Sequence, residues 1–398
     1  MSTTGYSWGN KKDILCFSTA LISHHRIHIN KGKQNKAQQC PVIRVHKEKM
    51  VDSKKEKYLG DFIDTSGKIR STIEDRKNRG YGIVSEILAI LDDIPLGKHR
   101  MDIGLHLREA MLLNGILFNS EAWHSLSLSE IKTLESVDEQ LLRGLVKAHS
   151  KTPLEFLYLE AGANPIRFII STRRMTYLQT ILKRSDEELT KRIYNQQKVD
   201  PSPGDFYLLV KDDFKMIKQE MNENEIKAIS KLSHKNNIKK KVRQSAFEYL
   251  TALKQTHSKV KDISYKKLET QTYMMSVLFN NDEVNTLHAL RSRSIDCKFN
   301  FKQKYLNQSI LCPLCEKHID DQKQMLNCEE ISKRLQLNEV VDGSVLYEDI
   351  FEDVAKQNVI TKILEIRKTL QIENLSTSAV LETSNDLQHC FDNLSSGK

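Results

Sequence analysis

The chain has 398 residues, and its 61 Lys and Arg outnumber its 52 Asp and Glu to give a formal charge of +9. Gly (15) and Pro (7) are scarce and charged residues reach 28%, a composition typical of long helices. It excludes a turn-rich sandwich or barrel and a disordered chain. No stretch approaches the ~18 consecutive apolar residues of a membrane-spanning helix, so no membrane partner is expected. The predicted fold class is mainly α.

Short apolar runs separated by polar loops occupy the first 66 residues. Residues 14–22 follow a Lys-Lys pair, as in a signal peptide, but a His-His-Arg run stands where a small-residue cleavage site would be needed. We interpret residues 14–22 as a buried β-strand, and residues 42–45 and 58–63 as further short strands. The sequence thus predicts a small β element ahead of the helices.

From residue 68 onward, apolar residues recur at helical spacing. The pattern predicts one helix that ends before Pro95 and a second over residues 101–123. Ser127 and Glu130 form a capping box for a third helix. An Asn-Pro pair at residues 164–165 predicts the N-cap and the first turn of a fourth.

Positive charge is concentrated in residues 231–267. This stretch holds eleven Lys or Arg and two acids, so its charge of +9 equals that of the whole chain. Such a cluster favours a phosphate backbone, because binding releases counterions from the nucleic acid. Interleaved Phe247, Tyr249 and Tyr265 could add stacking. The alternative is a solvated helix face that binds nothing.

The candidate nucleic-acid-binding residues come from this stretch and from a second basic group farther along the chain. They are Lys239, Lys240, Lys241, Arg243, Arg291, Arg293, Lys298 and Lys302. The expected partner is RNA or single-stranded DNA. No Gly-rich phosphate loop and no small-molecule substrate are evident, and the sequence leaves the oligomeric state open.

Cys312 and Cys315 form a CxxC motif, whose two thiolates can face one metal ion. Cys328 offers a third thiolate, and His318 is the nearest candidate for the fourth ligand. Gln324 stands where a histidine would complete a CxxC-x8-H-x3-C pattern. Zinc is the predicted metal; a zinc site that has lost its ion and a redox CxxC are the alternatives. Few, unevenly spaced cysteines in a lysine-rich chain favour free or metal-bound thiols, and so an intracellular protein, nuclear or cytoplasmic.

No catalytic residue is evident. Polymerases hold two metal ions with neighbouring aspartates, and the chain has three double acids, at residues 92–93, 212–213 and 320–321. None follows an aromatic residue on a hairpin. Each has a simpler interpretation, as a solvated helix end, a position in an amphipathic helix or part of the metal loop.

A series of short motifs stands in one order along about residues 42–375. It begins with Lys-Tyr-Leu-Gly-Asp at residues 57–61 and Ile-Asp-x-x-Gly at residues 63–67. The other motifs lie at residues 117–123, 152–155, 157–160, 173–178, 257–259, 290–293, 298–301 and 312–315. The series resembles the LINE-type (non-LTR) retrotransposon reverse transcriptases, and its first two motifs are similar to the last palm motif of that family. The specificity of the resemblance lies in the order of the motifs.

The resemblance implies the thumb and the C-terminal zinc-knuckle region of such an enzyme, without the catalytic palm. Tyr58, Leu59 and Gly60 would help to position the primer. The family's catalytic Asp-Asp hairpin would precede residue 1, so we expect no polymerase activity from this chain alone. The predicted function is the C-terminal nucleic-acid-binding portion of a retrotransposon RNA-directed DNA polymerase, catalytically incomplete as it stands. The alternatives are a helical protein–protein interaction scaffold and a zinc-binding regulator, either derived from a retroelement.

Within this framework the sequence divides into five segments. They are a palm-tail remnant with short strands (1–66), a helical thumb-like domain (67–200), a basic helical region (201–305), a CxxC zinc-knuckle-like element (306–335), and C-terminal helices with a frayed tail (336–398). A Pro-Ser-Pro-Gly run at residues 201–204 is the clearest linker candidate.

Overall fold

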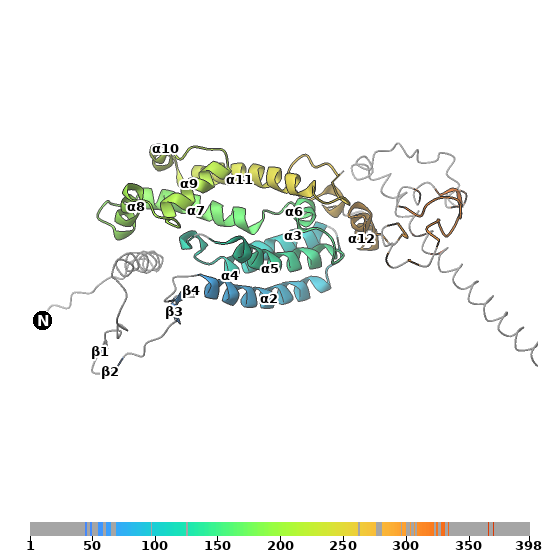
Figure 1. Ribbon diagram of the computed structural model, residues 1–398, viewed down its shortest axis with the longest axis horizontal. Coiled ribbons are helices and arrows are strands. Elements are labelled where there is room, and N and C mark those ends of the chain that lie inside the picture. The colour runs from blue at the N-terminus through green and yellow to red at the C-terminus, as the bar shows by residue number, and fades with distance from the viewer. Residues whose placement is uncertain are drawn as a thin grey trace, which may run out of the picture. The chain divides into compact units, whose positions relative to one another are not determined.

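The computed structural model is mainly helical (Figure 1). It describes residues 44–45, 48–49, 55–58, 61–64, 69–275 and 281–299 with single gaps at 97, 125, 262 and 296, and then 303, 306, 309–321, 324, 328–330, 333, 365 and 369. The prediction of a mainly α fold is therefore confirmed. The strand predicted over residues 14–22 lies outside the described residues.

Two short antiparallel hairpins precede the helices. β1 (Arg44–Val45) pairs with β2 (Glu48–Lys49), and β3 (Lys55–Tyr58) pairs with β4 (Asp61–Asp64). The single strand predicted over residues 58–63 is wrong, because the chain reverses between Tyr58 and Asp61, which lie opposite each other. Two-residue connections are the commonest in antiparallel hairpins.

The helices follow in chain order. They are α2 (Arg70–Asp92), α3 (Lys98–Leu107), α4 (Asn114–Ile116), α5 (Leu128–Val146), α6 (Leu154–Ala161), α7 (Ile166–Leu182), α8 (Leu189–Val199), α9 (Phe206–Met216), α10 (Glu223–Ala228), α11 (Lys231–Lys254) and α12 (Asn281–Arg291). None of the described helices combines the length and the apolar character that crossing a bilayer requires.

The chain divides into two compact units. The first comprises residues up to Ile90, Leu105–Leu141 and Ala163–Tyr249; the second comprises Leu91–Gly104, Leu142–Gly162 and the chain from Leu250 onward. The five-segment division stays a prediction. The run at residues 201–204 joins α8 to α9, which pack on each other within the first unit, where the Tyr194 and Phe206 rings lie 6.4 Å apart.

The predicted helix over residues 101–123 is interrupted. α3 passes into a π-helical turn (Arg108–Leu113), α4 adds three residues, and the chain turns at Asn119, whose φ of 60° is left-handed. The prediction for the third helix is confirmed, because Glu130 accepts a hydrogen bond from the Ser127 amide at 2.8 Å and its own amide donates to Ser127 Oγ at 3.3 Å.

Buried ion pairs tie the helices of the first unit together. Arg108 donates from Nε and Nη2 to the two carboxylate oxygens of Asp138, each at 2.6 Å, and both side chains are buried. Nη2 also donates to the backbone carbonyl of Asn164 at 2.9 Å. The predicted Asn164 cap is wrong: Pro165 is the N-cap residue of α7, and no side chain caps that end.

Candidate nucleic-acid interface and metal centre

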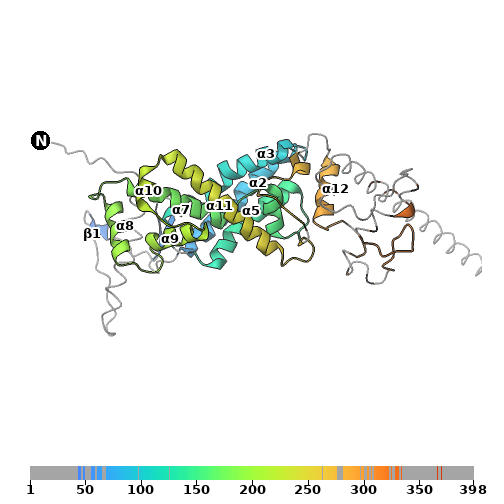
Figure 2. The ribbon, with the colours of Figure 1, turned by 90° about the horizontal axis from the view of Figure 1, so that it is seen from above.

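α11 is an amphipathic helix with one narrow buried face. In its first-unit part, a buried residue recurs every four positions, which keeps these side chains on one side of the helix. They are His234, Ile238, Val242 and Ala246. His234 ties the face to α7, because its Nε2 lies 3.1 Å from the backbone carbonyl of Met175. In both ribbon views α7, α9 and α10 lie beside this part of α11 (Figures 1 and 2).

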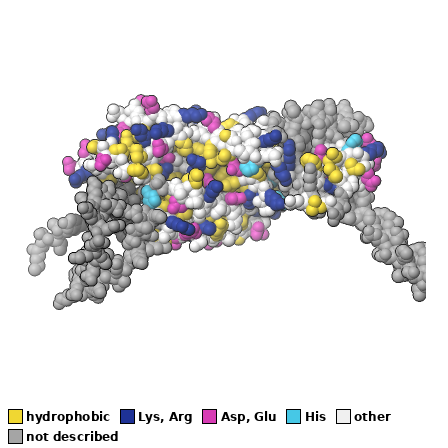
Figure 3. Space-filling view, viewed as in Figure 1, with side chains coloured by type: hydrophobic (Ala, Val, Ile, Leu, Met, Phe, Trp, Pro, Cys, Tyr) yellow, Lys and Arg dark blue, Asp and Glu magenta, His cyan; other side chains and the backbone are white. Residues whose placement is uncertain are grey.

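A row of cations runs along α11 beside this buried face, because each of its members follows a buried position by one residue or precedes one by three. Lys231, Lys235, Lys239 and Arg243 also recur every four residues, and all four are exposed. We call these four residues the α11 stripe. Four residues of helix rise about 6 Å, so the stripe spans about 18 Å. Figure 3 shows Lys and Arg side chains on the surface over α11.

The predicted cluster therefore lies at the surface, but its members differ in surroundings. Lys239, Lys240, Lys241 and Arg243 are all exposed. The Lys241 ammonium donates to the Gln219 side chain. Lys231 and Lys235 were not among the predicted binding residues, although their spacing of four from Lys239 is visible in the sequence.

The aromatic residues interleaved with this cluster have partners inside the protein. The Arg167 guanidinium lies 4.8 Å from the centre of the Tyr249 ring, and Phe168 makes an edge contact with the same ring at 5.5 Å. The Tyr265 hydroxyl donates to Glu160 in the second unit. Stacking on bases by Tyr249 and Tyr265 is therefore not supported by their positions.

The second basic group requires a correction. Arg291 is only 4% exposed, and its Nε donates to Glu160 at 2.7 Å, so it is not placed to contact a phosphate. Arg293, in a left-handed turn with φ of 50°, and Lys298 are half-buried. Lys302 lies outside the described residues. Arg291 looked like a surface cation in the sequence because its partner is 131 residues away.

Glu160 is the centre of a buried polar network in the second unit. Its carboxylate, 0% exposed, accepts hydrogen bonds from Arg291, from the Tyr265 hydroxyl and from the Tyr273 hydroxyl at 2.6 Å. His288 Nδ1 lies 3.1 Å from the Tyr273 oxygen. Burial, and to a lesser extent the negative charge of Glu160, raise the pKa of both tyrosines well above the usual value.

Three thiols converge in the second unit. The sulfurs of Cys312, Cys315 and Cys328 lie within 4.8 Å of one another, and those of Cys312 and Cys328 are 3.9 Å apart. A tight turn brings the CxxC pair together: the Glu316 amide donates to the Cys312 carbonyl at 2.9 Å, and Glu316 has a left-handed φ of 52°. Among the described residues, this is the only His, Cys, Asp or Glu group with the geometry to hold a metal ion.

The surroundings of Cys315 favour its thiolate. Burial acts to raise the pKa of Cys315, but backbone N–H groups of Lys317 and His318 and the neighbouring thiols outweigh it, so the pKa is lowered. Thiolates are the form that binds metal. The three cysteines can therefore hold a metal ion.

The fourth predicted ligand is not with the other three. The exposed His318 contributes its backbone carbonyl to the turn, accepting from the Cys312 amide at 2.7 Å, and its ring is not part of the thiol group. Gln324 occupies the neighbouring position, with Nε2 3.8 Å from the Cys315 sulfur. The prediction of His318 as a ligand is corrected accordingly.

The palm-like motif is described only in part. Leu59, Gly60 and the side chain of Tyr58 lie outside the described residues, so their primer-positioning role stays a prediction. Asp61 is buried, and its carboxylate accepts from Arg76 at 2.9 Å and from Asn119 at 3.3 Å. The aspartate of this motif therefore anchors the hairpin to the helices of the first unit.

Two of the three double acids have structural partners, and the third lies at a helix end. Asp213 accepts from Arg174 at 2.7 Å and from the Ser171 hydroxyl at 2.6 Å. Asp320 is buried and accepts from the Lys298 amide at 2.9 Å. Asp92 is the last residue of α2.

Comparison with known proteins found no matching family model, no matching curated protein and no matching solved structure.

Proposed function

We propose that the chain binds RNA or single-stranded DNA through the α11 stripe, as the C-terminal nucleic-acid-binding portion of a LINE-type retrotransposon RNA-directed DNA polymerase. The observation that carries the proposal is the row of four exposed cations at a spacing of four residues, which runs beside a continuous buried face. A flexible polyanion can follow such a row and neutralise several charges at once, which releases its own counterions.

Repulsion between the cations of the α11 stripe also favours binding of a polyanion. Like charges four residues apart destabilise a helix by about 0.2–0.5 kcal/mol per pair, and the α11 stripe contains three such pairs in succession. A bound phosphate backbone removes this repulsion. The arginine can contact phosphate with two parallel hydrogen bonds, whereas the lysines act as point charges.

The polymerase context rests on the ordered motifs in the sequence. The proposal assigns no nucleotidyl transfer to this chain. Two-metal catalysis needs carboxylates that face a common site, whereas Asp213 is neutralised by Arg174 and Asp320 is bound to backbone N–H.

Zinc is the metal proposed for the three-thiol group. Thiolate ligands suit zinc, and a closely spaced set with two buried members and backbone N–H donors to sulfur fits a structural site. Cys312, Cys315 and Cys328 would hold the ion, which would then cross-link the CxxC turn to the segment around residue 328. The set fits as three ligands of the usual four, because an amide stands at residue 324.

The proposal is tested by fluorescence anisotropy with a labelled 20-nucleotide RNA at low salt. Replacing the α11 stripe with glutamine should weaken binding by at least tenfold. A matched control replaces four other exposed lysines, Lys132, Lys211, Lys215 and Lys227, and so removes the same charge. The control should keep most of the affinity. Equal losses in the two variants would contradict the proposal, and so would unchanged binding by the stripe variant, which would favour the interaction scaffold.

A further inference from the structure

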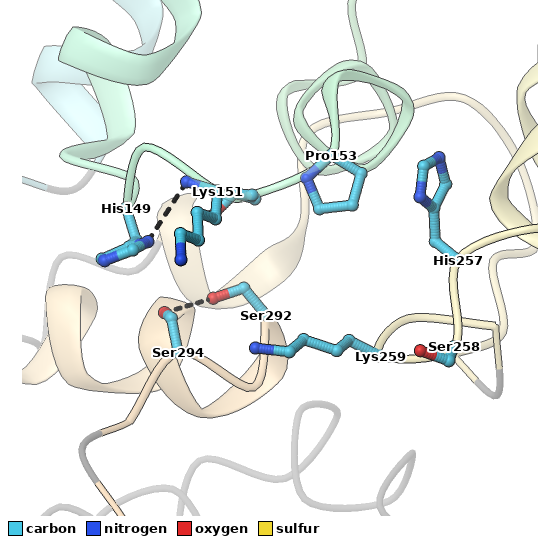
Figure 4. A pocket seen from close by; sticks show the side chains of 9 residues that line it. His149, Lys151, Pro153, His257, Ser258, Lys259, Ser292 and Ser294 are labelled. Atoms are coloured by element: carbon cyan, nitrogen blue, oxygen red, sulfur yellow. Dashed lines mark hydrogen bonds between the residues drawn. The ribbon is translucent and has the colours of Figure 1, made fainter. Parts of the chain in front are cut away.

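Three loops of the second unit line an open cavity of about 230 Å³ that none of the predicted roles uses (Figure 4). One loop joins α5 to α6, one follows α11 and one follows α12. Together the three loops supply all nine lining residues. They are His149, Lys151, Thr152 and Pro153 from the first loop, His257, Ser258 and Lys259 from the second, and Ser292 and Ser294 from the third.

Each loop is held in place by a cation behind it. Arg143 donates to the carbonyls of His149, at 2.7 Å, and of Thr152. Lys254, 1% exposed, donates to two carbonyls at the end of the second loop, at 3.0 and 2.6 Å. Arg291, bound to Glu160, fixes the start of the third loop. Two of these cations are bound to protein carbonyls and the third to a carboxylate. The loops are therefore held in place before any ligand binds.

The lining is cationic and rich in donors. It holds two lysines, two histidines and four hydroxyl groups, and none of the nine described lining residues is acidic. His257 Nε2 lies 3.2 Å from the carboxylate of Glu155, and the Ser292 and Ser294 hydroxyls are hydrogen-bonded to each other at 2.7 Å. Figure 4 shows the amine ends of Lys151 and Lys259 pointing toward the side of the cavity formed by Ser292 and Ser294. His149 Nδ1 accepts from the Lys151 amide at 3.1 Å, which fixes the position of that lysine.

One buried donor in the lining has no partner. Thr152 is 4% exposed, and its hydroxyl makes no hydrogen bond in the structure. A buried hydroxyl without a partner costs about 1–3 kcal/mol, so such groups are normally satisfied. A ligand that accepts a hydrogen bond from Thr152 would recover that cost.

We propose that this cavity binds the phosphate group of a small phosphorylated ligand or of a strand end. Phosphate matches the lining because it is anionic and purely an acceptor of hydrogen bonds when fully ionised, and the lining offers ammonium and hydroxyl donors. The volume falls below the roughly 300–1,000 Å³ of sites for drug-sized ligands, which suits one charged group rather than a whole large ligand. No lining residue belongs to α11, so the site is separate from the α11 stripe.

The test is isothermal titration calorimetry on the full chain at constant ionic strength, since surface charge effects are screened by salt. The probes are inorganic phosphate, adenosine 5′-monophosphate, and a tetranucleotide with either a 5′-phosphate or a 5′-hydroxyl. The first variant combines Lys151→Gln with Lys259→Gln. The second is Thr152→Val, which removes the hydroxyl while keeping the shape. The control combines Lys215→Gln with Lys227→Gln, which removes the same charge from exposed sites elsewhere.

We expect saturable binding of at least one phosphorylated probe, weakened at least tenfold in both cavity variants and unchanged in the control. Thr152→Val should leave the unfolding temperature unchanged or raised, because it removes an unpaired buried group, so a loss of affinity would not reflect a loss of fold. Binding of inorganic phosphate and the mononucleotide would identify a free small phosphate as the source. Binding of the 5′-phosphorylated tetranucleotide alone would identify a strand end. Absence of saturable binding by every probe, or equal losses in the control, would overturn the proposal.

Discussion

Replacing Glu160 with glutamine should destabilise the second unit. In the wild-type chain the Glu160 carboxylate neutralises Arg291, whose side chain is 5% exposed, and also accepts from two tyrosine hydroxyls. Glutamine keeps the size of the side chain but removes its charge, which leaves the guanidinium buried without a counter-charge. Removing one partner of a buried ion pair costs about 3–5 kcal/mol.

The loss should be visible where Glu160 meets the segment that follows residue 265. The Gln271 amide donates to the backbone carbonyl of Glu160 at 3.0 Å, so its hydrogen exchange reports opening of this contact. A loss of about 3 kcal/mol corresponds to exchange faster by about two orders of magnitude. Hydrogen exchange with mass spectrometry over residues 263–275 measures it.

A double-mutant cycle separates the ion pair from other effects. Arg291→Met alone should be as costly as Glu160→Gln, because it leaves the carboxylate buried and unpaired. The double variant should cost much less than the sum, since both charges are then gone. Asp212→Asn, at an exposed pair with Lys215, is the control and should leave exchange unchanged. A cost below about 1 kcal/mol for Glu160→Gln would refute the reasoning.

Three further predictions concern acid stability, a turn and the metal site. Burial lowers the pKa of His288 from 6.5 to about 4, so the unfolded chain binds this proton more readily than the folded one. The contribution of His288 to the free energy of unfolding should therefore be fully present above pH ~6.5 and fall by about 3 kcal/mol as the pH drops toward 4. Urea titrations at several pH values should show a smaller fall in His288→Leu than in wild type. An equal fall in the two proteins would contradict the reasoning. Gly162→Ala should destabilise the second unit by at least about 1–2 kcal/mol, because Gly162 has a φ of +63° and a Cβ there would lie 2.3 Å from backbone atoms of Glu269 and Thr270; an unfolding midpoint equal to that of wild type would contradict this. Gln324→His should tighten zinc binding by at least tenfold in a competition with a chromogenic chelator, since it supplies a fourth ligand beside the three thiols, and an unchanged affinity would show that residue 324 does not face the metal.

Features that depend on neighbours in the chain were predictable from the sequence. The Ser127–Glu130 box spans three residues and forms as expected. The approach of the Cys312 and Cys315 thiols follows from the CxxC spacing alone. The surface position of Lys239 follows from helical period, because the buried positions of α11 repeat every four residues.

Features that depend on distant partners were not predictable. Arg291 has the same sequence surroundings as a surface cation, and only the fold brings it to Glu160, 131 residues earlier. The cavity is likewise built from three loops that lie far apart in the sequence. More than a hundred residues separate Thr152 in the first loop from Lys259 in the second. His318 lies close enough in sequence to be a ligand, yet the turn uses its carbonyl and directs no ring nitrogen to the thiols.

The salt dependence of RNA binding tests the central claim most directly. Each phosphate neutralised on a single strand contributes about −0.7 to the slope of log affinity against log salt. Four stripe cations therefore account for a slope of about −2 to −3, which replacing Lys231, Lys235, Lys239 and Arg243 with glutamine should remove. The variant with Lys132, Lys211, Lys215 and Lys227 replaced should keep the wild-type slope. A slope that is the same in wild type and in the stripe variant would contradict nucleic-acid binding by α11.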